Sequence, residues 1–450
     1  MDASAHLLPG HALRRKLQAQ SGRYDRLGDL ATVWRPASLN GTAVPPNQGF
    51  PFFRSSQLFE LRPKPAKGFQ PDRIRDSQRW FVRPGTILLA RTGTGMVGRV
   101  VLARDVHANK LISRDPMRVK PLCPRQRGWI HAFLLAPATR AMMTAWCYGK
   151  DSGYIDLPHV ADLPVPRVDE KTAADFEEDT RRIWRLRDDS LRFTVEAEAL
   201  FARAVGKTFS PRHPEAESGF SIPFHHLKHG PRSLDAWRMH PLACCPWERS
   251  HDSRPSTAVA EAGFDIWQPD RYKRVAAPNG VPHWNGSDLL QTSLEPAKRC
   301  LDGAFGDPRY RGRVGPNWIL LVAAGGTQGS LGASLLASNA LRGHVVTSHV
   351  IRIVPRADAT MPRGYLLTAL SHPTLGLPRV RALAHGSVVQ HIVVPDLARL
   401  RVVRLHPRRE QAVADLAEKA AACRWRAALL EHQIAQRAQT ILRDLAGSDP

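Results

Sequence analysis

The sequence predicts a mixed α/β (α+β) protein with two tandem globular domains, separated by an antiparallel pair of long coiled-coil helices. Three observations favour this fold: an internal repeat, an apolar strand followed by a glycine-rich turn in each half, and a long heptad pattern at the end of each half. We expect the domains to span 1–168 and 207–405 and the helices to span 169–206 and 406–446. Such a duplication predicts a pseudo-twofold internal repeat.

The internal repeat consists of segments that occur in the same order in both halves. Residues 49–58 align without gaps with 280–289. The apolar strand 86–90 and the glycine-rich turn after it match 319–323 and a second such turn, at a slightly larger separation along the chain. Because the separation of matching positions grows slowly and their order is kept, we interpret the match as a duplication.

The heptad patterns predict two long helices, each with one apolar seam. At about 1.5 Å per residue, each helix would be on the order of 54 Å long and would reach beyond a single domain. We therefore expect the two seams to pack against each other; the alternative is that each helix folds back on its own domain. The seam residues expected to pack helices or partners are Phe176, Ile183, Leu186, Phe193 and Leu200 in the first helix and Val413, Leu416, Leu430, Ile434 and Ile441 in the second.

The composition favours a globular protein with a polyanionic partner. The chain of 450 residues has a formal net charge of +23 and 43% hydrophobic residues, enough to build cores. The alternative source of the charge is a generally arginine-rich composition. The sequence contains no run of 18 apolar residues and no secretory signal pattern, so we expect a soluble, cytoplasmic protein. The six cysteines form no C-x-x-C pair and are expected to be reduced.

Several short segments of the first half carry a family resemblance: 51–56 (PFFRSS), 84–94 (PGTILLARTGT) with Gly98 and Arg99, Tyr148-Gly149 leading to 155–158 (IDLP), and 163–166 (LPVP) before the long helix. In this combination the chain resembles the specificity (S) subunit of type I restriction-modification enzymes, over almost its whole length. The second half departs from the pattern, with AGGTQ at 324–328 where the first half has RTGT at 91–94.

This resemblance implies a subunit without catalytic activity that reads double-stranded DNA. Two target recognition domains would each read one half of a split DNA site. The helices would set the spacing and dock DNA adenine methyltransferase (modification) subunits, two in number, with restriction or translocase subunits where these are present. The implied setting is a restriction system, that is, phage defence.

Base edges are read by donors and acceptors, which Arg, Asn, Gln, Ser and Thr side chains supply. We therefore expect the DNA contacts in matched loops of the two domains. The predicted contacts are Arg54, Ser55, Ser56, Arg91, Thr92, Thr94, Arg99, Lys150 and Tyr154 in the first domain and Asn285, Ser287, Thr327, Gln328, Ser330 and Gln390 in the second.

Two motifs invite catalytic interpretations that their contexts do not favour. The G-x-G-x-x-G at 93–98 is followed by an apolar, β-branched segment, whereas a dinucleotide site needs a helix there, so we expect a strand, a turn and a strand. The D-x-K at 169–171, typical of one nuclease constellation, falls where a helix begins and is interpreted as an N-cap. No amino-methyltransferase motif is present, so we expect no catalytic residues and no cofactor.

A histidine-rich segment lies outside the repeated segments, within the expected second domain. His225, His226 and His229 lie near His240 and the pair Cys244-Cys245, but their spacing fits no closed zinc pattern, and we expect a solvated loop without metal. Two rival hypotheses for the whole chain stay open: a DNA reader of another modification or phage-exclusion assembly, and a non-catalytic helical scaffold whose basic charge is incidental.

Overall fold

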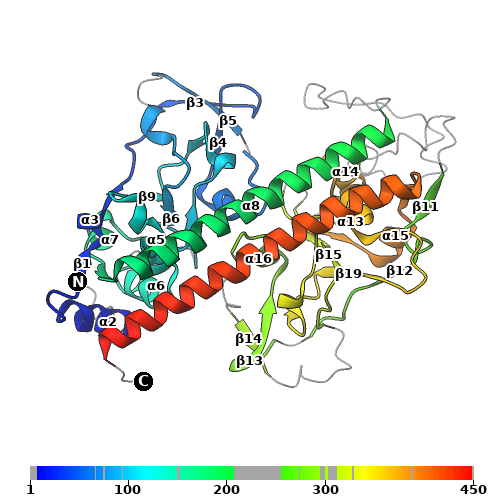
Figure 1. Cartoon of the computed structure of the whole chain (residues 1–450). Coiled ribbons are helices and arrows are strands. Elements are labelled where there is room, and N and C mark those ends of the chain that lie inside the picture. Colours follow the sequence, from blue (N-terminus) through cyan, green and yellow to red (C-terminus); the bar gives the residue numbers. More distant parts are fainter. Residues whose placement is uncertain are drawn as a thin grey trace. The chain divides into compact units, whose positions relative to one another are not determined.

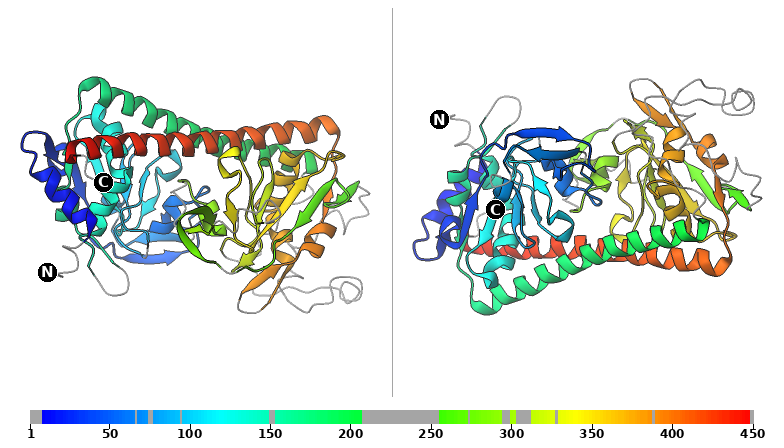
Figure 2. Two further views of the ribbon diagram at one scale, coloured as in Figure 1. Left: turned by 90° about the horizontal axis from the view of Figure 1, so that it is seen from below. Right: turned by 90° about the horizontal axis from the view of Figure 1, so that it is seen from above.

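The computed structural model describes residues 8–65, 67–73, 77–93, 95–148, 153–206, 255–272, 274–293, 299–302, 312–326, 329–386 and 389–447 (Figure 1). The chain forms two compact units: unit 1 comprises Met1–Asp188 and Arg426–Pro450, and unit 2 comprises Asp189–Trp425. Each unit is mixed α/β, which confirms the predicted fold class. Each unit also contains part of both long helices (Figure 2).

Unit 1 is built on two four-stranded sheets. The first has the order β2-β9-β6-β7, with β2 at Ala31–Trp34, β9 at Met117–Pro121, β6 at Ile87–Leu89 and β7 at Val100–Leu102. The second has the order β3-β5-β4-β8, with β3 at Gly41–Val44, β5 at Lys67–Pro71, β4 at Phe50–Phe53 and β8 at Leu111–Ile112. Helices and a strand pair complete the unit: α2 (Pro9–Gln18), α3 (Leu27–Leu30), α5 (Arg127–Leu135), α6 (Pro137–Thr144), α7 (Leu157–Ala161), β1 (Tyr24–Arg26) and β10 (Pro164–Pro166).

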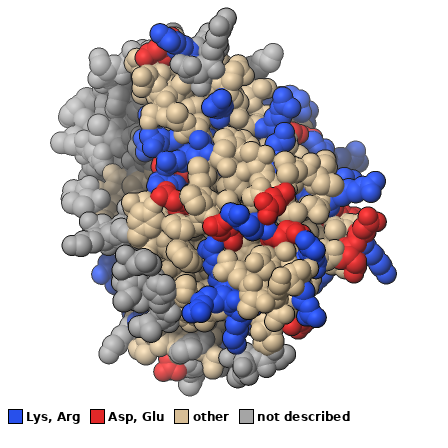
Figure 3. Space-filling model, turned by 90° about the vertical axis from the view of Figure 1, so that its left-hand side faces the viewer, with Lys and Arg blue, Asp and Glu red and all other residues tan. Residues whose placement is uncertain are grey.

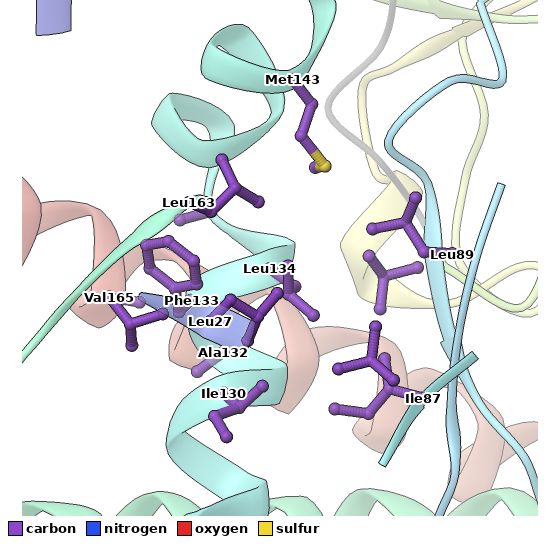
Figure 4. Close-up of a cluster of buried hydrophobic side chains, with 14 of the residues drawn as sticks. Leu27, Ile87, Leu89, Ile130, Ala132, Phe133, Leu134, Met143, Leu163 and Val165 are labelled. Carbon is purple, nitrogen blue, oxygen red and sulfur yellow. The ribbon is translucent and has the colours of Figure 1, made fainter. Parts of the chain in front are cut away.

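Strand β6 is buried on both faces. Ile87 and Leu89 belong to the main core, in which side chains of α5 such as Ile130 and Leu134 lie against the sheet (Figure 4). Leu88, which points to the opposite face, belongs to a separate cluster with residues of β4 and β8. Because alternate residues of a strand face opposite sides, a strand covered on both sides needs an unbroken apolar run, which is the pattern seen in the sequence.

Unit 2 repeats this topology. Its four-stranded sheet has the order β12-β19-β15-β17, with β12 at Phe264–Trp267, β19 at Val350–Pro355, β15 at Ile319–Val322 and β17 at Ser334–Leu336. Its second sheet contains β14 (Arg299–Leu301), β13 (Ala276–Trp284) and β18 (Val345–Val346). The remaining elements are β11 (Ser256–Ala258) with β22 (Arg401–Val403), β16 (Ala324–Gly325), β20 (Ala384–His385), β21 (Gln390–Ile392), α12 (Gly286–Leu289), α13 (Arg363–Ser371), α14 (Leu377–Ala382) and α15 (Val394–Arg399).

A fully buried arginine joins the two sheets in each unit. Arg118 lies opposite Leu88 in the ladder, and its Nη2 donates to the carbonyl oxygen of Ile112 in the second sheet at 2.8 Å. Arg352 lies opposite Leu320, and its Nη2 donates to the Val346 carbonyl at 2.6 Å. Arg118 and Arg352 are as many residues apart in the chain as their acceptors Ile112 and Val346, so this hydrogen bond is repeated in the two units. Burial lowers the pKa of Arg118, and the carbonyl oxygens supply the acceptors that a buried guanidinium requires.

The helices α8 (Glu170–Val205, 36 residues) and α16 (Pro407–Ala446, 40 residues) confirm the two predicted long helices. Asp169 caps the first, because its Oδ1 accepts the Thr172 backbone N–H at 2.7 Å. This confirms that the D-x-K motif marks a helix start.

Each long helix approaches a domain helix at a glycine. A Cβ on Gly128 of α5 would lie 2.2 Å from the backbone nitrogen of Glu177 in α8, and a Cβ on Gly364 of α13 would lie 2.5 Å from the Ala414 carbonyl oxygen in α16. The residue after each glycine donates a hydrogen bond to the last residue of a short strand, β10 in unit 1 and β22 in unit 2. Trp129 Nε1 donates to Pro166 O at 2.9 Å, and the Tyr365 hydroxyl donates to Val403 O at 2.6 Å. The long helices are therefore packed directly against the domains.

Within unit 1, α8 and α16 run antiparallel and are joined by charged pairs. Arg187 Nη2 lies 2.6 Å from Glu431 Oε2, with the two side chains only 7% and 3% exposed. Asp179, two turns earlier in α8, pairs with Arg437, later in α16. Within unit 2, the Ser190 hydroxyl donates to the Ala420 carbonyl at 2.8 Å.

The apolar seams are shared between the helix pair and the domain cores. Phe176, Ile183 and Ile434 lie in the main core of unit 1, against which Leu186, Leu430 and Ile441 also pack. In unit 2, Val413 is in the core, and Leu200 and Leu416 pack against it. Phe193 instead lies 4.3 Å from the Arg192 guanidinium, ring centroid to Cζ. The seam residues therefore pack against the domain cores as well as against the other long helix. The heptad pattern predicts which face of a helix is buried, but it does not predict what covers that face.

Replacing Arg118 by Met should lower the free energy of unfolding by about 3 kcal/mol, because it leaves buried carbonyls without a donor. Arg352→Met should behave alike in unit 2. Urea denaturation of the full chain measures the loss. Arg125, which is exposed, provides the matched control, and Arg125→Met should change stability by less than about 0.5 kcal/mol. An Arg118→Met protein as stable as this control would contradict the assignment.

Arg187→Met should lower the free energy of unfolding by about 3 to 5 kcal/mol, because Glu431 would remain buried without its partner. Adding Glu431→Leu should restore most of the loss, since both charges are then gone. Arg192→Met, which removes only exposed ion pairs, should change the free energy of unfolding far less than Arg187→Met. A double variant no more stable than Arg187→Met would argue against a coupled buried pair.

Acid should destabilise unit 1 through its buried histidines. Burial and the nearby Arg187 lower the pKa of His131 from 6.5 to about 3. The unfolded chain therefore binds a proton below pH 6.5 that the folded chain does not bind, so stability falls as the pH drops from 6.5 toward 3. Between pH 7 and pH 5, the free energy of unfolding of the His131→Gln variant should fall by about 2 kcal/mol less than that of the wild-type chain. Urea denaturation at the two pH values measures this difference. His432→Gln, at an exposed position, should leave that loss unchanged.

Candidate nucleic-acid interface

The glycine-rich turn of unit 1 connects two antiparallel strands, β6 and β7. Gly98 N–H donates to Ala90 O at 3.0 Å, and Ala90 N–H donates to Arg99 O at 2.8 Å, which close the turn. Gly93 and Gly98 adopt positive φ of 105° and 76°, where residues with a Cβ are strained. A strand follows the motif, which confirms the predicted strand, turn and strand and leaves no helix N-terminus for a dinucleotide.

The turn of unit 2 has the same closure with two more residues. Gly332 N–H donates to Val322 O at 2.8 Å, so Val322 corresponds to Ala90 and Gly332 to Gly98. This pairing differs by one position from the alignment of the two sequences, in which 319–323 matches 86–90. The difference arises because a short apolar run has no side chain that marks its register.

An arginine from the helix behind holds each turn. Arg140 of α6 donates from Nε to Val97 O at 3.2 Å and from Nη2 to Gly95 O at 2.8 Å. Arg381 of α14 donates in the same way to Leu331 O at 3.0 Å and Gly329 O at 2.9 Å. Neither arginine was predicted from the sequence. Arg140 and Arg381 follow their turns by different numbers of residues, so they do not align in the repeat.

Three arginines gather at the end of the first sheet of unit 1, and we call Arg35, Arg91 and Arg114 the arginine cluster. Arg35 follows β2, Arg91 follows β6 and Arg114 precedes β9, and all three stand at the same end of the sheet because Trp34 pairs with Arg118 and Leu89 with Met117. Burial and then the charges of Arg91 and Arg114 lower the pKa of Arg35, whereas Asp156 and Asp115 raise it. Arg114 donates to the Ser38 hydroxyl. Such a concentration of guanidinium groups attracts anions and hydrogen-bond acceptors.

Two tyrosines and an aspartate adjoin the arginine cluster. The Arg91 guanidinium lies 4.7 Å from the ring of Tyr154 and 3.1 Å from Asp156 Oδ1. The Tyr148 hydroxyl donates to Asp156, and the Tyr148 and Tyr154 ring centroids are 4.1 Å apart. The hydrogen bond to Asp156 raises the pKa of Tyr148 to about 12, and hydrogen bonds from Tyr148 and Arg91 hold the pKa of Asp156 below its ordinary value.

The corresponding region of unit 2 carries histidines. His385 of β20 pairs with His391 of β21, as Tyr148 pairs with Tyr154 in unit 1. Along the chain, His385 is as many residues from Tyr148 as His391 is from Tyr154, so the two histidines occupy the repeated positions of the two tyrosines. The His391 ring is 5.9 Å from His349, and His385 Nε2 is 2.6 Å from Asp396. Burial, then His391, Arg274 and Arg271, lower the pKa of His349. The spacing of the repeat was the signal that could have identified these histidines.

The structure brings several predicted contact residues of unit 1 near the arginine cluster. Ser55 Oγ lies 3.3 Å from Ser113 Oγ, next to Arg114, at the start of a 3₁₀ turn (Ser55–Phe59). Arg54 and Ser56 in the same segment are exposed, and Thr92 pairs with Tyr154 through an isolated bridge.

Arg99 is placed differently from the expectation. Its residue is 6% exposed, its guanidinium lies 4.8 Å from the Phe59 ring, and Nη1 is 3.2 Å from the Met96 sulfur. Arg99 directly precedes β7, and its side chain lies beside the second core cluster of unit 1, so it is largely buried where the sequence predicted a DNA contact.

In unit 2 the predicted residues have mixed surroundings. Asn285 caps α12, whose Asp288 accepts the Asn285 N–H at 3.0 Å, and Ser287 is exposed on the same helix. Ser330 is part of the turn, and Gln390 pairs with Gly325 between β21 and β16. Four predicted contacts, Thr94, Lys150, Thr327 and Gln328, lie outside the described residues.

Charge on the surface is mixed rather than gathered in one stripe on the face drawn in Figure 3, where Lys and Arg alternate with Asp and Glu. Among the described residues, no group of three or more His, Cys, Asp or Glu side chains could hold a metal ion. The histidine- and cysteine-containing segment 225–245 lies outside the described residues. In the part of the chain that is described, no helix is long and apolar enough to cross a membrane.

Comparisons with known proteins gave structural likenesses only. No family model and no curated protein matches the chain. The S subunit of a type I restriction-modification system from M. genitalium is similar over 97% of this chain and 99% of its own, with 12% identity and a TM-score of 0.40.

Two further solved structures are similar over most of their length. One, described as showing complex assembly and conformational transition of the type I R-M system, shares 16% identity over 95% of this chain and 98% of its own, with a TM-score of 0.29. The HsdS subunit from Thermoanaerobacter tengcongensis shares 15% identity over 95% and 97%, with a TM-score of 0.28. Because these TM-scores are low, we infer the function from the chain's own residues.

Proposed function

We propose that this chain is the DNA sequence-recognition subunit of a type I restriction-modification complex. Each unit reads one half of a bipartite DNA site, and the chain itself catalyses no reaction. The observation that carries the proposal is the repetition of one scaffold with different strand ends. The strand order, the buried arginine and the arginine-held turn recur, whereas the side chains at the strand ends differ. His385 and His391 of unit 2 stand in the places of Tyr148 and Tyr154, and Ala323 stands in the place of Arg91.

A duplicated scaffold with unlike ends suits two half-sites of unlike sequence. Direct reading of bases depends on the side chains presented to the groove, while the scaffold that presents them can stay the same. The net charge of +23 supplies the sequence-independent attraction to phosphates that such reading requires. The sequence resemblance points to the same class of subunit.

The long helices are the proposed docking surface for methyltransferase subunits. Each carries a large apolar side chain that is exposed in the chain alone, Val195 of α8 at 52% and Leu429 of α16 at 53%. Exposed apolar residues on a helix suit packing against a partner helix. In this proposal the partners perform the methylation and, where present, the cleavage.

The chain purified with an adenine methyltransferase should enrich a two-part site from randomised duplexes and protect two segments in a footprint. Arg54→Ala together with Arg114→Ala should lower affinity for the enriched duplex about tenfold and reduce the slope of log K against log salt, because phosphate-binding charges are lost. Arg125→Ala, which removes an exposed arginine elsewhere in unit 1, is the matched control and should change little.

The rival functions predict other results. A helical scaffold would bind its partner yet enrich no sequence. A reader from a different DNA-modification or phage-exclusion assembly would enrich a two-part site without binding the methyltransferase. If the complex enriches a site but its affinity is unaffected by the paired substitution, Arg54 and Arg114 do not contribute to the interface.

A further inference from the structure

The guanidinium of Arg91 is held in one orientation from two sides. Its Nη2 is 3.1 Å from Asp156 Oδ1, and its Cζ lies 4.7 Å from the Tyr154 ring centroid. The backbone is fixed as well, since Ile155 N–H donates to Arg91 O at 3.3 Å. An arginine whose side chain is already ordered loses little conformational freedom when it binds.

The carboxylate that orients Arg91 is itself held. The Tyr148 hydroxyl donates to the second oxygen of Asp156, so the two oxygens serve different partners. Because these bonds hold the pKa of Asp156 below its ordinary value, the group is an anion at neutral pH. Tyr148, Asp156 and Arg91 therefore form a chain of contacts that ends at the guanidinium.

The protein does not use all the donors of Arg91. Its Nε is buried and has no hydrogen-bond partner among the described residues, while 14% of the side chain remains exposed. A guanidinium carries five N–H donors in a planar fork. Because Nε is enclosed by the protein, an acceptor from outside the chain would bind the donors of the terminal nitrogens in the exposed part of the side chain.

The carboxylate beside Arg91 selects between the two acceptors that DNA offers. A phosphate brought to Arg91 would approach Asp156 and be repelled by it, because both are anions. A guanine edge is neutral and presents N7 and O6, which match two donors of one guanidinium. An arginine fixed by an aspartate thus suits a base more than the DNA backbone.

We propose that Arg91 reads a guanine in the half-site bound by unit 1, with Asp156 as the positioning residue. This inference rests on the proposed function and names the base that one of its units recognises.

Unit 2 lacks this device. The strand position that corresponds to Arg91 is Ala323, since Ala323 O accepts the Ile392 N–H at 2.8 Å as Arg91 O accepts that of Ile155. Alanine has no donor for a base edge. Among the described residues, the position that supplies the proposed guanine contact in unit 1 therefore has no base-edge donor in unit 2, which makes the two half-sites unequal.

The test uses the full chain, with its methyltransferase if it binds one, and the duplex that the wild-type protein enriches. Each guanine of that duplex is replaced in turn by 7-deazaguanine, which keeps base pairing but lacks the N7 acceptor. For one guanine the wild-type affinity should fall about tenfold. Arg91→Ala should lose this discrimination, so that the same replacement changes its affinity less than about twofold.

Asp156→Asn tests positioning. It keeps the shape of the side chain and should reduce the guanine discrimination about threefold while leaving binding to a non-specific duplex unchanged, whereas a purely structural loss would weaken both duplexes equally. Arg114→Ala is the matched control, which should lower affinity for all duplexes and preserve the discrimination. Circular dichroism spectra confirm that each variant folds.

The outcomes separate this inference from the proposed function. If the wild-type chain enriches no sequence, the proposed function fails. If it enriches a site but Arg91→Ala keeps the same 7-deazaguanine penalty, the guanine assignment is overturned and the proposed function stands. If Arg91→Ala weakens every duplex equally and lowers the salt slope by about one, Arg91 contacts phosphate and the inference is likewise overturned.

Discussion

The architecture of each unit depends on a buried arginine that joins two sheets through backbone carbonyls. Arg118 of β9 donates to Ile112 O at the end of β8, and Arg352 of β19 donates to Val346 O at the end of β18, so each arginine joins the first sheet of its unit to the second. A buried cation is tolerated only where acceptors surround it, so the local backbone is restricted to conformations that point carbonyls inward.

Above this common frame the two units have diverged at their strand ends. Arg140 and Arg381 hold the glycine-rich turns by the same pair of bonds even though the second turn is two residues longer. The groups around the turns differ, since His385 and His391 of unit 2 stand where unit 1 has Tyr148 and Tyr154. Ala323 stands where unit 1 has Arg91. A rigid frame with variable ends suits the reading of two different sequences, because side chains on rigid elements keep their orientation.

Predictions from the sequence were correct where the signal was local and periodic. The heptad patterns predicted both long helices, the capping position Asp169 marked the start of one, and the residues after Gly98 indicated a strand instead of a helix. Charged residues in the interior were not predicted. Arg99 was expected to contact DNA and lies largely buried against Phe59, and the buried Arg118 was not singled out, since an arginine carries no local sign of being buried.

The duplication, the mixed α/β class and the extent of the long helices could all be inferred from the order of residues, because hydrophobic periodicity and repeated turns are written within a few positions of one another. Folding was needed to reveal what covers each apolar seam, which arginines are buried, and that Asp156 lies against Arg91, 65 residues away in the chain. Such contacts depend on strand pairing and helix packing between segments that are distant in the chain. A short stretch of sequence does not determine which distant segment will pack against it.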